Sequence, residues 1–496
     1  MQLRVSCSGI SRRVKNPPRR NSILTLPRDI LRIFRILWGI FCGMGAADMT
    51  QQSGRIWVMG GRPLNGTAEI PAAKNSVLPL LAASLLCHGP VQLRGVPRLS
   101  DVECCMALLR GAGGTADWQG GDVVVSGSPS CSTLPGETAA RMRASVLFCA
   151  PLLARLGRAE TALPGGCPIG ARPIDLHLEG LARMGARELD AGPGRLVLTA
   201  PAGLHGADLT LRFPSVGATE TLMLAAVCAR GTTTLRGAAR EPEITDLAAF
   251  LNRCGGCVEG AGGSTLRIEG RRALGGCVFS PLPDRIFAST LACAAAAAGG
   301  RVELAGCPPS LYAPVLETLE QMGCVVARSS GGAQVSRFGR LYGAGRVFTG
   351  VYPGLATDAA PLLAAVMLCA GGESSIEDVV FERRFGCAEG FARLGGRVKL
   401  MGRVLSAGPL PEGGLHGTSL SAPDLRGGAA LVVAALAAQG RSWVEEVHHI
   451  DRGYAGLDRT LNALGARIGR EMRHPDTAEK KIPSKKQICL AFGAKR

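Results

Sequence analysis

Apolar and polar residues follow one pattern that returns about every 70 residues along this chain. In each repeat a helical segment closes on an apolar residue near a glycine, and the residues that follow are usually β-like. A glycine at that place suits the C′ position of a helix, where the backbone turns left-handed. The closing glycines are Gly113, Gly185, Gly255, Gly323, Gly395 and Gly465.

This repeat predicts six α/β units of one kind between residues 57 and 470. A solenoid of such units needs polar caps at its open ends, and we recognise none in the sequence. We therefore predict an α/β fold of two closed domains, each built from three units.

The composition fits a globular protein, because 46% of the residues are apolar and only 19% are charged. The formal net charge of +17 lies mainly at the ends of the chain. Residues 1–48 carry nine Lys or Arg against two Asp, and residues 472–496 carry seven basic residues against two acidic ones. The rest of the chain keeps only +5, so we expect no nucleic-acid partner.

The N-terminal segment holds an apolar run over residues 36–47 that is too short to span a bilayer as a helix. Basic residues, this run and the small residues 45–47 together mimic a secretory signal. Alternatively, the true start is Met49, where the character of the sequence changes. We favour the second interpretation and expect residues 1–48 to be an extension without stable membrane insertion.

The 18 cysteines are scattered along a chain of ordinary globular size. Such usage is typical of a reduced, cytoplasmic protein. Cys254 and Cys257 have a metal-like spacing, but no second pair or nearby histidine completes a site. We therefore predict that this pair is structural and that the chain holds no metal.

One cysteine, Cys167, lies on a glycine-rich loop bounded by prolines, five residues before Arg172. Glycines let the backbone bend and approach a ligand, and a nearby cation lowers the pKa of a thiol. The loop then resembles a lid that carries its own acid or nucleophile. Most cysteines, however, are small buried hydrophobic residues. Composition alone leaves both interpretations open.

Nine motifs in the same order resemble the UDP-N-acetylglucosamine enolpyruvyl transferases over roughly residues 55–470. The motifs are Ala72–Pro79, Arg141–Ser145, the Cys167 loop, Ser215–Glu220, Ala238–Ile244, Pro283–Ile286, Thr357–Asp358, Asp424–Arg426 and Asp451–Tyr454. The resemblance implies a two-domain inside-out α/β barrel. Residues 49–73 and 284–471 would form domain I, residues 74–283 domain II with the cysteine loop, and residues 472–496 a basic tail.

The family transfers the enolpyruvyl group of phosphoenolpyruvate to the 3′-hydroxyl of UDP-N-acetylglucosamine, releasing phosphate, in the first committed step of peptidoglycan synthesis. The resemblance implies no cofactor. It makes Cys167 the acid that protonates C3 and forms an adduct, and Asp358 the residue near the sugar hydroxyl. Lys74 and Arg452 complete the implied catalytic set. Asp358 would also fit a helix cap.

Phosphoenolpyruvate carries a phosphate and a carboxylate, so its pocket needs several fixed cations. The resemblance gathers such cations at a cleft between the domains. A turn at residues 215–217 could offer N–H groups to a diphosphate, or simply cap a helix. The substrate-binding residues implied are Lys74, Asn75, Arg143, Arg172, Pro173, Ile174, Asp175, Leu176, Phe213, Pro214, Ser215, Val216, Asp358, Val380, Arg426 and Arg452.

Two alternatives remain open. The sister transferase that acts on shikimate 3-phosphate shares the fold but lacks the cysteine loop. A non-catalytic relative that binds a UDP-sugar or a regulatory partner draws support from two departures. Residues 359–362 read Ala-Ala-Pro-Leu where the family has Met-Gln-Ala-Gln, and Gly427 and Gly428 replace Ala-Ser. The sequence leaves the oligomeric state open.

Overall fold

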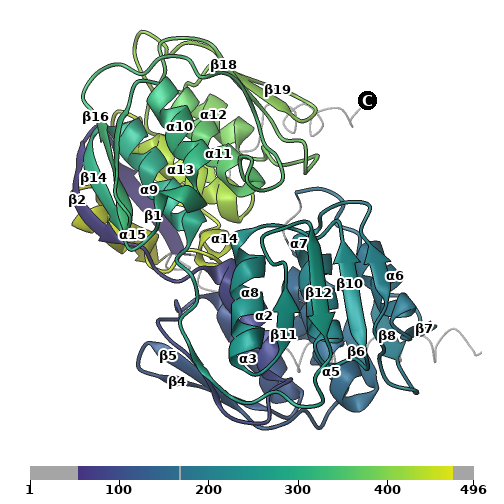
Figure 1. The fold of residues 1–496 in the computed structure, drawn as a ribbon. Coiled ribbons are helices and arrows are strands. Elements are labelled where there is room, and N and C mark those ends of the chain that lie inside the picture. The colour runs from purple at the N-terminus through teal and green to yellow at the C-terminus, as the bar shows by residue number, and fades with distance from the viewer. Residues whose placement is uncertain (1–53, 167–168, 473–496) are drawn as a thin grey trace, which may run out of the picture. The chain divides into compact units, whose positions relative to one another are not determined.

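Six small sheets carry the strands of this computed structural model, which describes residues 54–166 and 169–472 (Figure 1). Among those residues five sheets have four strands and one has three. Residues 1–53, 167–168 and 473–496 lie outside the described part. The expected N-terminal extension, Cys167 and nearly all of the basic tail therefore lie outside it as well.

The five four-stranded sheets share one topology, as units of one kind require, whereas the three-stranded sheet contains antiparallel pairs alone. A parallel pair of strands continues into antiparallel pairs, as in β9, β10, β12 and β11. The first three sheets have the orders β21(Ser419–Ser421)-β22(Arg441–Glu445)-β1(Gly54–Met59)-β23(Arg467–Met472), β15(Val325–Arg328)-β16(Gly332–Arg337)-β14(Gly300–Ala305)-β2(Leu64–Glu69) and β17(Gly345–Phe348)-β18(Ser374–Glu377)-β20(Val404–Ala407)-β19(Val398–Met401). The other three are β11(Cys257–Glu259)-β12(Thr265–Glu269)-β10(Thr232–Arg236)-β9(Asp208–Thr210), β13(Val278–Phe279)-β3(Val91–Leu93)-β5(Asp122–Ser126)-β4(Thr115–Gln119) and β6(Arg158–Ala162)-β8(Arg195–Thr199)-β7(Arg187–Leu189).

One amphipathic or short helix per unit ends at the predicted glycine. These helices are α3(Ser100–Gly111), α6(Asp175–Arg183), α8(Pro242–Arg253), α10(Ala313–Gln321), α12(Ala388–Arg393) and α15(Leu457–Ala463). All six glycines have φ between 91° and 99°. In each case the glycine N–H and the next N–H donate to carbonyls three and five residues back, which is the Schellman pattern. The prediction of six matched helix ends is confirmed.

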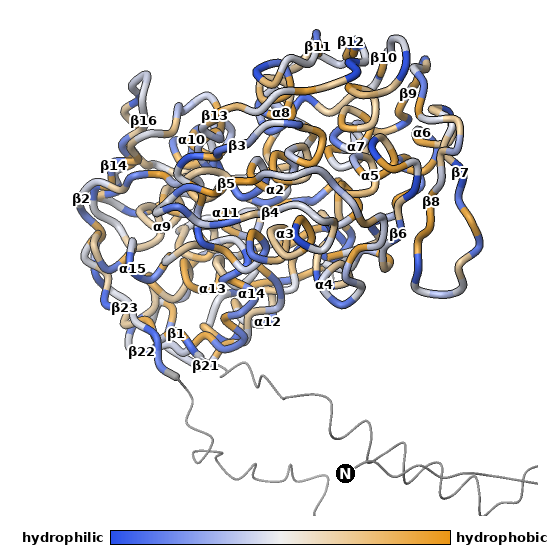
Figure 2. Tube along the Cα trace, turned by 90° about the horizontal axis from the view of Figure 1, so that it is seen from below, coloured by the Kyte–Doolittle hydropathy of each residue, from blue (hydrophilic) through white to orange (hydrophobic). Residues whose placement is uncertain are grey.

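The other helix of each unit is buried over most of its length. These inner helices are α2(Lys74–Ser84), η1(Arg143–Phe148) with α5(Cys149–Leu156), α7(Val216–Ala226), α9(Arg285–Ala298), α11(Ala360–Met367) and α13(Leu425–Ala437). A helix that is apolar all round belongs inside a core. Figure 2 accordingly shows α13 mostly in hydrophobic colours. Helices α9, α11 and α13 pack against one another, and η1 packs against α2, α5 and α7. The sheets thus lie outside the helices. Short elements complete the set: α4(Gly136–Ala140), η2(Pro309–Leu311), η3(Thr357–Ala359) and α14(His448–Asp451).

The buried apolar residues form two clusters. The first contains residues between Ile56 and Ile70 and between Ile286 and Ile468, and the second runs from Val77 to Leu274. We call the elements around these clusters lobe I and lobe II. The predicted domain boundaries at residues 73/74 and 283/284 stay a proposal.

The chain passes between the lobes twice, and the two passages are hydrogen-bonded to each other. The N–H of Ala73 donates to the carbonyl of Leu282 and that of Asp284 to Pro71, both at 2.8 Å. Over residues 54–166 and 169–472, no helix combines the length and the apolar character that crossing a membrane demands.

Candidate active site

Five of the six inner helices begin at one cavity of about 600 Å³, and η3, which leads directly into α11, lines it as well. Helix N-termini carry unpaired N–H groups and a positive partial charge, so their convergence favours anions. The cavity is also lined by basic side chains from both lobes. Those side chains are Lys74, Arg143, Arg172, Arg285, Arg384, Arg426 and Arg452.

Nearly every site residue expected from the sequence lines this cavity. Those that do are Lys74, Asn75, Arg143, Arg172, Pro173, Asp175, Leu176, Phe213, Pro214, Ser215, Val216, Asp358, Val380, Arg426 and Arg452. Ile174 does not, because its side chain packs against the apolar cluster of lobe II at the start of α6. Cys167 lies outside the described residues.

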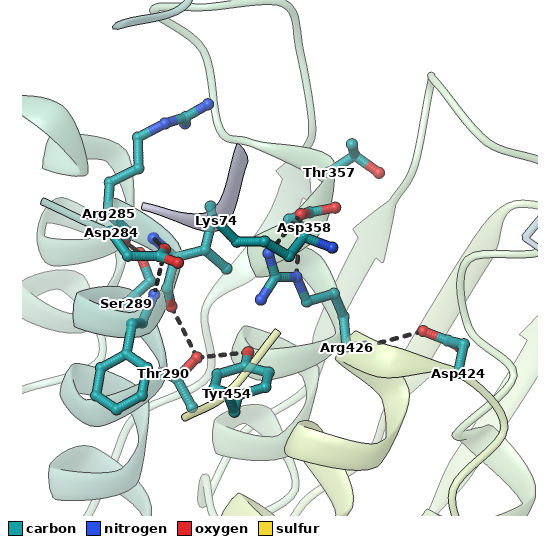
Figure 3. Close-up of polar contacts among 12 residues, drawn as sticks. Lys74, Asp284, Arg285, Ser289, Thr290, Thr357, Asp358, Asp424, Arg426 and Tyr454 are labelled. Carbon is teal, nitrogen blue, oxygen red and sulfur yellow. Dashed lines mark hydrogen bonds and ion pairs between the residues drawn. The ribbon is translucent and has the colours of Figure 1, made fainter. Parts of the chain in front are cut away.

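Asp358 lies between the guanidinium groups of Arg384 and Arg426, and Figure 3 shows it beside Arg426. Arg384 donates to its Oδ1, and the Nε of Arg426 donates to its Oδ2 at 3.0 Å. Burial alone would raise the pKa of Asp358, but Arg426, Arg384 and Lys74 outweigh it and hold that pKa well below its usual range. Asp358 is therefore a carboxylate at neutral pH, although 27% of its side chain remains exposed.

A fully buried carboxylate, Asp378, stabilises the position of Arg384 beside Asp358. It accepts hydrogen bonds from the hydroxyl of Thr357 and from the N–H groups of Val380 and Phe381, the last two at 2.8 and 2.7 Å. The Thr357 oxygen in turn accepts from the Nε of Arg384 at 2.9 Å. The position of Arg384 beside Asp358 thus depends on Asp378 through Thr357.

A second carboxylate, Asp101, forms ion pairs with Lys74 and Arg452. The Lys74 Nζ lies 3.0 Å from its Oδ2, and the Arg452 Nε lies 2.9 Å from its Oδ1. Burial favours the protonated acid, but the two cations prevail and lower the pKa of Asp101. Because Arg452 belongs to lobe I, this cluster joins the two lobes.

Another buried ion pair crosses between the lobes. The Nε and Nη2 of Arg285 donate to the two carboxylate oxygens of Glu243 at 3.0 and 3.2 Å. Beside it, burial and then the neighbouring carboxylates raise the pKa of Glu220 well above its ordinary value. This part of the cavity wall therefore combines a charged pair with a carboxyl group that favours its neutral form.

The wall contributed by lobe II holds a cation and an imidazole. The Nη2 of Arg143 donates to the Pro173 carbonyl at 2.8 Å. Burial and then the charge of Arg172 lower the pKa of Arg143 to about 10. Burial, followed by the charge of Arg143, lowers the pKa of His177 to about 4. His177 is therefore neutral near pH 7.

The two glycines before Cys167 allow close approaches that a side chain would block. A Cβ on Gly165 would meet the Ala140 carbonyl oxygen at 1.9 Å, and one on Gly166 would meet the Arg172 Nη1 at 3.3 Å. Gly166 also has a φ of 131°. The residue that precedes the cysteine therefore lies against the arginine that the sequence placed five residues after it.

Ser215 caps α7, since its hydroxyl accepts from the Ala218 N–H at 3.3 Å. Phe213, two residues earlier, is 45% exposed on the cavity wall. Ser215 therefore caps this helix, and Val216 and Gly217 after it also line the cavity.

The departures from the resembled family have packing reasons. A Cβ on Gly427 would lie 2.8 Å from the Pro423 side chain, and one on Gly428 would lie 2.8 Å from Ala422 and Ile450. Ala359 and the three residues after it are buried at the start of α11. These positions pack in the core behind the cavity, and the substitutions there do not remove a cation from its wall.

Sequence reasoning assigned no role to Asp101, Asp378 or Glu243. An acidic residue in the first turn of a helix, as Asp101 is, is common because it suits the helix dipole. Its site role becomes visible only when Arg452 is found beside it. In the part of the chain that is described, no cluster of three or more His, Cys, Asp or Glu could hold a metal ion.

A family model described as EPSP synthase (3-phosphoshikimate 1-carboxyvinyltransferase) matches residues 58–461. The UDP-N-acetylglucosamine 1-carboxyvinyltransferase of Nitratidesulfovibrio vulgaris is 42% identical over 419 residues, covering 84% of this chain and 99% of its own. The protein of that name from Acidiphilium cryptum is 43% identical over 417 residues, with the same coverage.

Solved structures show the same fold. The enolpyruvyl transferase NikO from Streptomyces tendae superposes with a TM-score of 0.75 and 26% identity, covering 85% of this chain and 100% of its own. The EPSP synthase of Acinetobacter baumannii gives a TM-score of 0.66 at 19% identity, with coverage of 84% and 100%.

Proposed function

The chain belongs to the EPSP synthase family, and from that membership we propose a specific reaction for it. It transfers the enolpyruvyl group of phosphoenolpyruvate to the 3′-hydroxyl of UDP-N-acetylglucosamine and releases phosphate, the first committed step of peptidoglycan synthesis. The acceptor follows from relatives that are 42 to 43% identical over 84% of the chain and carry that activity in their names. The two-lobed fold with inner helices is that of the enolpyruvyl transferases.

The observation that carries this proposal is the gathering of Lys74, Arg426 and Arg452 around one cavity with the Asp358 carboxylate. Phosphoenolpyruvate brings a phosphate and a carboxylate, which fixed cations bind through charge-assisted hydrogen bonds. The starts of the inner helices add a further positive potential.

The reaction is an addition followed by an elimination. Cys167, by resemblance, protonates C3, the sugar hydroxyl attacks C2 and gives a tetrahedral ketal, and loss of phosphate yields the enolpyruvyl ether. Asp358 accepts the proton of the hydroxyl. In the structure both of its oxygens are engaged by Arg384 and Arg426.

An arriving phosphate competes with Asp358 for Arg426. Once that guanidinium turns to the phosphate, Asp358 keeps one partner instead of two, and its pKa rises toward the range that a base needs. Substrate binding would thus prepare the base for the step that follows.

The nucleotide sugar lies along the lobe II wall in this proposal. Arg172 to Leu176, Phe213 to Val216 and Val380 would contact it. The first turn of α7 would offer N–H groups to the diphosphate, because the Ser215 hydroxyl takes only that of Ala218 and because Val216 and Gly217 line the cavity. We also propose that residues 74–283 form domain II, because the buried apolar cluster of lobe II runs from Val77 to Leu274.

We also propose that the protein acts in the cytoplasm, where activated sugars and phosphoenolpyruvate are made. The cysteines of the described residues all carry free thiols, which supports a reducing compartment.

Phosphate release by the full chain tests the proposal. The protein is incubated with phosphoenolpyruvate and either UDP-N-acetylglucosamine or shikimate 3-phosphate, and mass spectrometry follows the acceptor. We expect release only with the nucleotide sugar, which gains one enolpyruvyl group. Release only with shikimate 3-phosphate would identify the sister activity, and binding of the sugar without release a non-catalytic relative.

The role of Cys167 has its own test. Fosfomycin, a phosphoenolpyruvate mimic that alkylates this thiol in the family, should add one molecule to the chain when the sulfur opens its epoxide. Intact-protein mass spectrometry detects that adduct, and the Cys167→Asp variant should show none. A surviving adduct in the variant contradicts the assignment.

A further inference from the structure

The segment that returns from lobe II to lobe I lies along one face of α8. It touches the helix at four levels, which are spaced three or four residues apart as one helix face requires. The four contacts are Cys277 with Cys254, Phe279 with Phe250, Leu282 with Asp246, and Arg285 with Glu243.

The contacts differ in kind along the segment. At the cavity end Arg285 pairs with Glu243, and further along the Leu282 N–H donates to the Asp246 Oδ2 at 3.2 Å. The rings of Phe279 and Phe250 then meet edge to face, with centroids 5.5 Å apart. Polar and apolar contacts hold three levels, and the last level is made by two thiols.

Cys254 and Cys277 have their sulfur atoms 3.3 Å apart. Cys254 follows the last turn of α8 and is 3% exposed, whereas Cys277 precedes β13 and is partly exposed. The Gly275 N–H donates to the Cys254 carbonyl at 2.7 Å, which fixes the two backbones beside each other. A disulfide needs about 2.05 Å between sulfurs, so a small rotation of the side chains brings them into bonding range.

We propose that Cys254 and Cys277 form a reversible disulfide when the protein meets hydrogen peroxide, which fastens the return segment covalently to α8. Peroxide first oxidises the more exposed Cys277 sulfur to a sulfenic acid and leaves one water. The Cys254 sulfur then attacks the sulfenic sulfur, the S–S bond forms, and the hydroxyl departs as a second water. A dithiol reductant returns two electrons and two protons and restores both thiols.

Two further cysteines, Cys257 and Cys87, compete with Cys277 as disulfide partners of Cys254. Cys257 shares the glycine-rich turn with Cys254, but it starts strand β11. The neighbouring Cys87 thiol, and then burial, raise the pKa of the Cys254 thiol. Burial also raises the pKa of Cys277 to about 12. The thiols are therefore protonated at neutral pH, and oxidation needs sustained exposure to peroxide.

The full chain, incubated with peroxide or with dithiothreitol, is then alkylated, digested with trypsin and analysed without reduction. We expect residues 254–267 to be joined to residues 273–285 after peroxide only. The Cys257→Ser variant should keep that cross-link, and the Cys277→Ser variant should lose it. Alkylation of both thiols after peroxide, or a bond from Cys254 to Cys87 or Cys257, would overturn the proposal.

Thermal unfolding supplies a second measurement. The disulfide closes a loop that limits the unfolded chain, so we expect peroxide to raise the midpoint by roughly 5 °C. The rise should disappear in Cys277→Ser and in Cys277→Ala, whose midpoints without peroxide report whether they fold. An unchanged midpoint in the oxidised natural chain would contradict the proposed fastening. None of these outcomes depends on the transferase reaction.

Discussion

Asp358 and Asp101 each engage two cations at the same cavity, but the cations come from different places. Both partners of Asp358, Arg384 and Arg426, belong to lobe I with it. Asp101 takes Lys74 from its own lobe and Arg452 from the other. The Asp358 side chain is 27% exposed to the cavity, and that of Asp101 only 7%.

The difference in exposure and in the origin of the partners indicates two different roles for these carboxylates. A ligand can reach Asp358 and take one of its partners, so its ion pairs can be exchanged during a reaction. Asp101 is covered, and its ion pairs join elements far apart in the chain. Charge at the first site should matter to chemistry, and charge at the second to the integrity of the fold.

Replacing the more open carboxylate gives the largest expected effect. Asp358→Asn keeps the shape but cannot accept the proton of the sugar hydroxyl, so kcat should fall by about 10³-fold. Steady-state phosphate release measures this, and the unfolding midpoint of the variant controls for folding. A kcat within tenfold of the natural chain would remove Asp358 from the role of base.

Replacing Asp101, the covered carboxylate, should mainly reduce the stability of the fold, whereas replacing Asp358 should mainly reduce the reaction rate. Asp101→Asn leaves Lys74 and Arg452 without their counter-charge, and removing one partner of a buried pair costs about 3 kcal/mol in the free energy of unfolding. Urea unfolding measures it. Glu471→Gln, at the exposed pair with Arg55, is the matched control and should change stability by less than about 1 kcal/mol. Equal losses in the two variants would contradict the distinction.

Acid should weaken the fold through the same carboxylates. The pKa values of Asp101 and Asp358 are both lowered in the folded protein, so only the unfolded chain takes up protons as the pH falls below about 5. The stability that they contribute is complete above the unfolded pKa near 4 and is lost as the pH drops toward the folded values. Unfolding midpoints from pH 7 to 3 should therefore fall less steeply for Asp101→Asn. Parallel curves would refute this.

The smallest expected effect concerns how Arg384 is held. Thr357→Val removes the hydroxyl that links Arg384 to Asp378, and we expect kcat to fall by about tenfold with little change in the KM for phosphoenolpyruvate. Thr357→Ser keeps the hydroxyl and should restore most of the rate. The acid limb of the kcat profile should also shift in Thr357→Val, because Asp358 loses a positioned partner. An unshifted limb with an equal loss in the serine variant would indicate packing alone.

Local signals explain what the sequence predicted of the fold. A glycine after a helix indicates a left-handed backbone conformation at its own position, and Gly113 and its five equivalents all adopt that conformation. The cavity wall was predicted from motif order, and Ile174 shows the limit of that approach, since one member of a motif can face the core.

Partners distant in sequence explain what was missed. Asp101 and Arg452 are separated by 351 positions, and only Arg452 belongs to one of the nine motifs. Similarly, the spacing of Cys254 and Cys257 indicated that pair, whereas the thiols that interact with Cys254 belong to Cys277 and Cys87. Only the path of the return segment along α8 brings Cys254 and Cys277 together.

The paired passages between the lobes have a consequence for protein engineering. Because residues 71–73 and 282–284 are hydrogen-bonded to each other, the point where the chain enters lobe II and the point where it leaves are one strand spacing apart, about 5 Å. A short turn from residue 73 to residue 284 could therefore replace lobe II and leave lobe I as a continuous chain. In the excised lobe II, a similar turn could join residues 283 and 74, and a circular permutation could then open a new N-terminus elsewhere in that lobe. Each lobe is, in effect, a cassette with adjoining ends.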